Sequence, residues 1–179
     1  MIGILFIMKT VTDFLQVVLN QSQQALKKNE IPVGAVVYDP KKMTLISKAH
    51  NKELSSKDPT SHAEILCIRK ACKKLNQKRL DGLIMITYLE PCNMCKEVIK
   101  SARIKEVRFI YSNQNPSRKT IKKIIYQKLE TNDENLVKTF FKKKELKIST
   151  NIFSIVFLIP FYFFCNLINF ISTFLISVP

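Results

Sequence analysis

Apolar and polar residues follow one another in blocks that predict helices and strands in turn. Over Thr10–Lys28, apolar side chains recur three or four residues apart while glutamine, lysine and asparagine fill the other face, which predicts an amphipathic helix. The β-branched run Val33–Tyr38 predicts a buried strand. A turn at Asp39-Pro40 separates it from Thr44–Asn51, which we expect to be its partner strand.

The same alternation continues toward the C-terminus. Ser61 and Glu64 have the spacing of a capping box, at the start of a helix expected to end near Asn76. The later predicted elements are a buried strand Leu83–Leu89, a helix from Pro91 to about Ala102, a strand Val107–Tyr111, a lysine-interrupted strand Ile121–Leu129, and a helix capped by Thr131 and ending near Leu146. Helices that cross between strands predict an α/β fold, with a mixed sheet covered on both faces.

Charge divides the chain into two parts. Lysine and arginine number 29 against 14 acidic residues, a formal charge of +15, and no charged residue follows Lys147. The excess therefore lies within residues 1–150, which we expect to form the folded domain, and it favours an anionic partner such as nucleic acid or a phospholipid surface. A general bias of the composition toward lysine, isoleucine, asparagine and phenylalanine explains the charge equally well.

The segment 151–179 is uncharged and apolar. It is long enough to cross a bilayer, and the lysines just before it would stay on the cytoplasmic side. The alternative is a non-native extension, produced by a frame disruption or read-through in an AT-rich genome, and we favour it over a membrane anchor.

The stretch LEPCNMC places two cysteines, Cys92 and Cys95, at a predicted helix start. The positive end of the helix dipole favours their thiolates, and a spacing of three residues puts both sulfurs on one face. They form either half of a tetrahedral metal site or a redox pair. The cysteine count is odd, at five, and no secretion signal precedes the domain, so we expect a reducing, cytoplasmic setting rather than a disulfide framework.

A second helix start, SHAEI, carries His62 and Glu64. Side chains at an open helix N-terminus can bend toward the same small volume, so His62 can complete a three-ligand zinc site with Cys92 and Cys95. Three protein ligands leave a fourth position for water, as in catalytic zinc sites. Glu64 would then move a proton from that water to a leaving group.

The pairing of His-x-Glu with Pro-Cys-x-x-Cys is the signature of zinc nucleobase deaminases. The chain resembles the cytidine deaminase-like superfamily, and its residues 10–148 are most similar to bacterial tRNA adenosine deaminases. The resemblance rests on IPVGAVVYD (Ile31–Asp39), AHN (Ala49–Asn51), DPTSHAEI (Asp58–Ile65), LEPCNMC (Leu89–Cys95) and SARIKEVRF (Ser101–Phe109).

This resemblance implies a three-layer α/β/α sandwich around a mixed five-stranded sheet, a homodimer, and one zinc ion per subunit. It implies deamination of adenosine to inosine at the wobble position of a tRNA anticodon loop. It also implies that Asn51 contacts the target nucleoside and that the backbone amide of Ala63 helps to hold the base.

The similarity ends after Tyr111, where SNQNPSRKTIKK replaces the glycine-rich loop and short helix of the family. That region helps to grip the anticodon loop, so its loss favours an alternative substrate, a free base or nucleoside such as guanine or cytosine. Two further alternatives are a non-catalytic chain that keeps zinc for stability and a redox or purely structural Cys-x-x-Cys protein.

Overall fold

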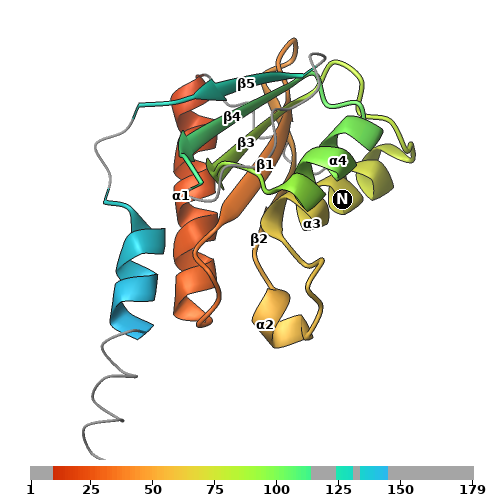
Figure 1. Ribbon diagram of the computed structural model, residues 1–179. Helices are drawn as coiled ribbons and strands as arrows, with labels where there is room; N and C mark the ends of the chain where they lie inside the picture. The colour runs from red at the N-terminus through yellow and green to blue at the C-terminus, as the bar shows by residue number, and fades with distance from the viewer. Residues whose placement is uncertain (1–9, 114–123, 131–133, 145–179) are drawn as a thin grey trace, which may run out of the picture. The chain divides into compact units, whose positions relative to one another are not determined.

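The computed structural model describes residues 10–113, 124–130 and 134–144 (Figure 1). The chain forms two compact units, Met1–Val137 and Lys138–Pro179. The first unit contains every helix and strand labelled below. Of the second unit, only residues 138–144 are described, and they are helical.

A single five-stranded sheet forms the centre of the first unit, with the order β2-β1-β3-β4-β5. Its strands are β1 (Gly34–Asp39), β2 (Thr44–His50), β3 (Ile84–Leu89), β4 (Glu106–Tyr111) and β5 (Ile125–Lys128). Strand β1 pairs antiparallel with β2 and β3, whereas β3–β4 and β4–β5 are parallel. The predicted mixed five-stranded sheet is therefore confirmed.

Helices cover both faces of this sheet. Helix α1 (Val11–Lys27) lies on one face, and α3 (Ala63–Leu75) and α4 (Asn93–Ser101) lie on the other (Figure 1). The run of apolar residues in β1 and β3 is explained by this arrangement, because both strands are buried along nearly their whole length. The core lies between the sheet and these helices.

Helix α1 packs closely against β1 at Gly34. A Cβ atom at this glycine would lie 2.5 Å from the carbonyl oxygen of Val18 and 2.8 Å from the backbone nitrogen of Ser22. Nearby, the rings of Phe14 and Tyr38 stack with their centroids 4.3 Å apart. The absence of a side chain at Gly34 thus fixes the spacing between the helix and the sheet.

The start of α3 differs from the prediction. His62, not Ser61, is the N-cap residue, and no side chain caps the helix. The Ser61 hydroxyl instead donates a hydrogen bond of 2.8 Å to Oδ2 of Asp58, which competes for it within the preceding loop. The predicted capping box of Ser61 and Glu64 is therefore wrong.

Smaller differences occur at other elements. Helix α4 begins at Asn93 rather than Pro91, with Cys92 as its N-cap. A short helix, α2 (Glu53–Ser56), was not predicted. Strand β5 (Ile125–Lys128) lies in the later part of the predicted Ile121–Leu129, of which residues 121–123 are outside the described ranges.

Several predictions concern residues outside the described ranges: the Thr131 cap, the end of the last helix and the apolar segment 151–179. Within the described ranges, no helix is both long enough and apolar enough to cross a membrane.

Candidate metal centre and active site

Two helix N-termini bring His62, Cys92 and Cys95 together. His62 is the N-cap of α3, Cys92 is the N-cap of α4, and Cys95 lies in the first turn of α4. Nδ1 of His62 is 3.7 Å from Sγ of Cys92 and 3.5 Å from Sγ of Cys95. The three ligand atoms all lie within 4.8 Å of one another.

This triangle has the dimensions of a zinc site. Bond lengths of about 2.3 Å to sulfur and about 2.1 Å to nitrogen, at a tetrahedral angle, place the nitrogen about 3.6 Å from each sulfur. The two observed distances lie on either side of that value. One imidazole and two thiolates are also a donor set that zinc prefers, so the residues present fit the ion.

The two sulfurs differ in their tendency to ionise. The hydrogen bond from Cys95, together with His62, lowers the pKa of Cys92 well below its ordinary value. The same interaction with Cys92, followed by burial, raises the pKa of Cys95. Cys67, on α3, differs from both, because burial raises the pKa of its thiol to about 12. Among the described cysteines, Cys92 and Cys95 are the two whose sulfurs lie beside His62, so position rather than pKa selects them as ligands.

The other ring nitrogen of His62 faces a carboxylate. Nε2 lies 3.6 Å from Oε2 of Glu53, which belongs to α2. At this distance the carboxylate favours a proton on Nε2 electrostatically, while Nδ1 faces the sulfurs. Sequence reasoning missed Glu53, because a four-residue helix carries no periodic signal.

Glu64 lies beside this cluster in the first turn of α3, with an exposed fraction of 4%. Burial is the largest influence on its carboxyl group and raises its pKa to about 7, against the lowering effects of its own backbone N–H and of His62. A group with this pKa can take up and release a proton near neutral pH.

Of the two residues implied as substrate contacts, Ala63 lies at the start of α3, and Asn51 precedes Lys52, whose backbone N–H bonds to Ser61 just before that start. Asn51 follows β2 and is 3% exposed, and its backbone N–H donates to the carbonyl oxygen of Val33 at 2.9 Å. Ala63 is fully buried at the first position of α3. Because Ala63 is the first residue of the helix, its amide is one of the N–H groups without an intrahelical partner.

Sequence reasoning also missed Glu30. Its carboxylate is completely buried and accepts hydrogen bonds from Asn51, Leu54 and Ser55. The only local signal is an acidic residue placed between a lysine-rich helix end and an apolar strand, which is too common to identify a site.

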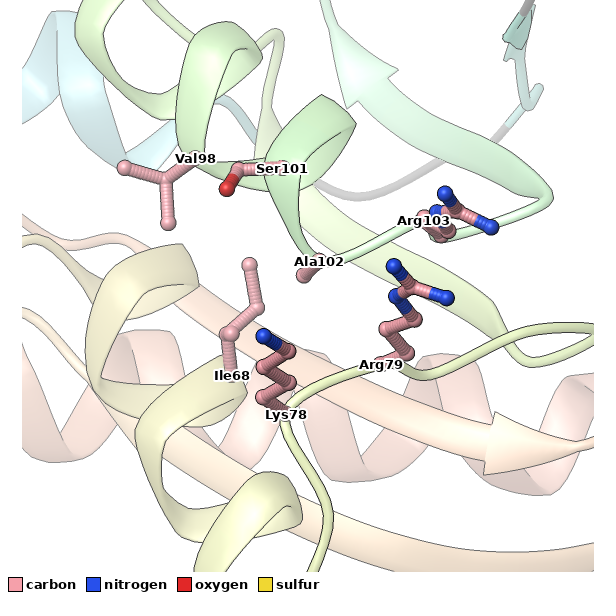
Figure 2. A pocket seen from close by; sticks show the side chains of 7 residues that line it. All are labelled: Ile68, Lys78, Arg79, Val98, Ser101, Ala102 and Arg103. Atoms are coloured by element: carbon pink, nitrogen blue, oxygen red, sulfur yellow. The ribbon is translucent and has the colours of Figure 1, made fainter.

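A basic cavity lies at the other ends of α3 and α4. It has a volume of about 430 Å³, and Figure 2 shows the side chains of Lys78, Arg79 and Arg103 around it, beside Ile68, Val98, Ser101 and Ala102. No ion pair engages these three cations within the described parts of the chain. The length of helix α4, about 13 Å, separates this cavity from Cys92.

The cytidine and deoxycytidylate deaminase zinc-binding region matches residues 8–111, which is more than half of the chain. The chain therefore belongs to this family, and the resemblance drawn from its motifs is confirmed. The predicted zinc cofactor is confirmed as well, by the family's zinc-binding region together with the cluster of His62, Cys92 and Cys95.

Relatives within the family include two kinds of deaminase. A tRNA-specific adenosine deaminase from Aquifex aeolicus is 46% identical over 96 residues, which are 54% of this chain and 62% of that protein. The match thus covers less than two thirds of its length. A solved structure from a study of A-to-I editing by tRNA:A34 deaminases is 29% identical, with a TM-score of 0.56, and covers 64% of this chain and 97% of its own. The structure of guanine deaminase from Bacillus subtilis is 35% identical, with a TM-score of 0.53, covering 57% of this chain and 65% of its own.

Proposed function

We propose that this protein is a zinc-dependent hydrolase that deaminates adenosine to inosine at the wobble position of tRNA. The observation that carries the proposal is the convergence of two helix N-termini. It places Nδ1 of His62 within 3.7 Å of both cysteine sulfurs, with the buried carboxyl group of Glu64 beside them. We assign His62, Cys92 and Cys95 as the zinc ligands and Glu64 as the catalytic acid and base.

In this proposal, the chain's own residues position the reactants and move protons. When bound, zinc supplies a Lewis acid that lowers the pKa of water. Glu64 removes a proton from the water molecule as its oxygen adds to the carbon that carries the exocyclic amino group. The same carboxyl group passes this proton to ring nitrogen N1 and then carries the proton of the added hydroxyl group to the departing amine, which leaves as ammonia as the carbonyl group of inosine forms. Asn51 and the amide of Ala63 hold the nucleoside in place.

Two observations support tRNA as the substrate. The Aquifex relative and the A34 deaminase structure are both described as acting on tRNA. In addition, the formal charge of +15 and the three cations around the basic cavity, Lys78, Arg79 and Arg103, favour a polyanion. The guanine deaminase from Bacillus subtilis supports the alternative, a free base or nucleoside, as does the absence of the family's glycine-rich loop after Tyr111.

A parallel assay separates the two substrates. Purified protein is incubated with an anticodon stem-loop carrying adenosine at the wobble position and, separately, with free guanine, cytosine and adenosine. Inosine in the RNA, with no turnover of the free bases or nucleosides, is the expected result. Efficient release of ammonia from guanine or cytosine, with unmodified RNA, would replace our proposal with the alternative.

Substitutions in the basic cavity test tRNA binding separately from the deamination reaction. Replacement of both Arg79 and Arg103 by glutamine should weaken binding of full-length tRNA and make its dependence on salt shallower, because fewer phosphates are neutralised. The same double variant should turn over any small substrate at the wild-type rate. Unchanged tRNA affinity and salt dependence would show that this cavity is not part of the RNA-binding surface.

We further infer a cytoplasmic homodimer in which residues 1–150 form the deaminase domain. The resemblance to tRNA adenosine deaminases supports the dimer and the tRNA anticodon loop as a partner. We also infer that residues 151–179 are dispensable. Removal of this segment should therefore leave the activity unchanged, whereas a membrane anchor would show itself when the full chain sediments with vesicles and the shortened chain does not.

A further inference from the structure

A completely buried carboxylate, that of Glu30, lies between α1 and β1. It accepts hydrogen bonds from three nitrogens: the backbone N–H of Ser55 at 2.7 Å, the backbone N–H of Leu54 at 3.1 Å, and Nδ2 of Asn51 at 3.3 Å. Burial of an isolated carboxylate is costly, so these donors are what allow Glu30 to remain ionised away from water. All of them belong to one stretch of chain, 21 to 25 residues further on.

The contact with Glu30 sets the orientation of the Asn51 amide group. A carboxylate only accepts hydrogen bonds, so the amide nitrogen must face Glu30, and the amide oxygen Oδ1 lies on the opposite side. Within residues 10–113, 124–130 and 134–144, no hydrogen bond engages Oδ1. The buried contact thus presents this oxygen as an acceptor for a hydroxyl or N–H group of a bound nucleoside.

Glu30 also contacts the loop 52–61, which joins Asn51 to His62. Its base is closed by a hydrogen bond of 3.0 Å from the backbone N–H of Lys52 to the carbonyl oxygen of Ser61. Inside it lies α2, whose first turn is held by the two backbone bonds to Glu30. One end of this loop is the candidate nucleoside contact, and the other end is a zinc ligand.

We propose that Glu30 is a positioning residue, which orients the Asn51 amide toward the substrate and anchors the loop between Asn51 and His62. The part that concerns Asn51 rests on the proposed function, because it takes Asn51 as a contact to the nucleoside. The part that concerns the loop does not depend on any activity. Glu30 itself touches neither substrate nor metal.

Glu30→Gln tests the proposal with little change in shape. The amide nitrogen of the new glutamine is itself a donor and would face the N–H groups of Asn51, Leu54 and Ser55. Some of their hydrogen bonds to residue 30 must therefore break. We expect KM for the anticodon stem-loop to rise about tenfold while kcat changes less than threefold, since the loss of an oriented contact weakens binding. Glu97→Gln, which alters an exposed glutamate on α4, is the matched control and should change neither constant.

A double-mutant cycle separates positioning from a general structural role. Asn51→Ala alone should raise KM, and adding Glu30→Gln to it should raise KM less than twofold further, because Glu30 acts through the side chain already removed. If the two effects on KM multiply instead, Glu30 does not act through Asn51 and the positioning role is overturned.

Amide hydrogen exchange tests the loop independently of activity. In the wild-type protein, the N–H groups of Leu54 and Ser55 should exchange at least tenfold more slowly than in Glu30→Gln, while Glu97→Gln should match the wild type. Equal exchange in Glu30→Gln and wild type would overturn the anchoring role. If Glu30→Gln does not fold, Glu30→Asp, which keeps the charge but shortens the reach, should show the same loss to a smaller extent.

The two kinds of readout also distinguish the possible failures. A wild-type protein inactive on the stem-loop refutes the proposed function, and the exchange experiment still decides whether Glu30 anchors the loop. An active wild type with unaltered KM and exchange in Glu30→Gln refutes the positioning role alone.

Discussion

Glu30 and Glu64 are both shielded from solvent, with exposed fractions of 0% and 4%, yet their carboxyl groups behave in opposite ways. At Glu30, burial raises the pKa, but hydrogen bonds from Ser55, Leu54 and Asn51 outweigh it, and the net pKa is lowered. At Glu64, burial dominates and the pKa is raised to about 7. The donors around each carboxyl group, together with its depth below the surface, decide whether it is held as a fixed charge or left able to exchange protons.

Of the substitutions at these two glutamates, we expect the one at Glu64 to have the largest effect on the rate of deamination. Glu64→Gln should lower the rate of deamination by roughly 10²- to 10⁴-fold, the range expected for loss of a general acid and base. Zinc should remain bound, because Glu64 is not one of the assigned ligands. Rate measurements on the stem-loop, with metal analysis of the same sample, check this; a variant that retains both zinc and activity would contradict the role of Glu64.

At Glu30 the larger effect should be on stability. Glu30→Gln leaves buried N–H groups without their acceptor, so the free energy of unfolding should fall by about 1–3 kcal/mol. Urea denaturation at pH 7 measures this difference. Glu97→Gln serves again as the exposed control and should lie within about 0.5 kcal/mol of the wild type.

The pH dependence of that difference follows from the lowered pKa. The pKa of Glu30 in the folded protein is below its ordinary value of 4.5, so its charge contributes stability above that pH, and the contribution is lost as the pH falls through the folded pKa. The gap between wild type and Glu30→Gln should thus be constant near neutral pH and narrow in acid. Denaturation curves from pH 7 downward test it, and a gap that widens in acid would contradict the assignment.

The smallest effect is expected on the stability of the zinc-free protein when Glu64 is replaced. Burial opposes ionisation of this carboxyl group, so Glu64→Gln removes an unfavourable charge and should change the free energy of unfolding by less than about 1 kcal/mol, or increase it slightly. The same denaturation experiment, in the presence of a chelator, measures it. A loss as large as that of Glu30→Gln would remove the distinction between the two residues.

The two glutamates also show what could be predicted from the sequence. Glu64 lies in a short motif with His62, and the Cys-x-x-Cys motif is equally local, so both could be placed near helix starts from the sequence, although the capping box predicted at the first start was wrong. Glu30 depends on partners 21 to 25 residues away, and nothing in its neighbourhood signals them. The candidate site residues therefore lie in short local motifs, whereas the residue that holds the neighbouring loop in place, Glu30, is identified only by tertiary contacts.

The fold was predictable for a similar reason. Continuous apolar runs marked β1 and β3, and the helical periodicity marked α1. The start of α3 was predicted wrongly, because the Ser61 hydroxyl has a competing acceptor in Asp58 that the capping pattern does not reveal. Helix α2 was missed because the side chain of Glu30 holds its first turn, which is a contact made by folding rather than by local propensity.

Zinc content measured on the wild-type protein and on single variants of its three assigned ligands tests the central claim most directly. We predict one zinc per wild-type chain, with loss of zinc from His62→Ala, Cys92→Ala and Cys95→Ala and retention in Cys67→Ala. A wild-type chain that binds no zinc, or ligand variants that keep a full equivalent, would contradict it.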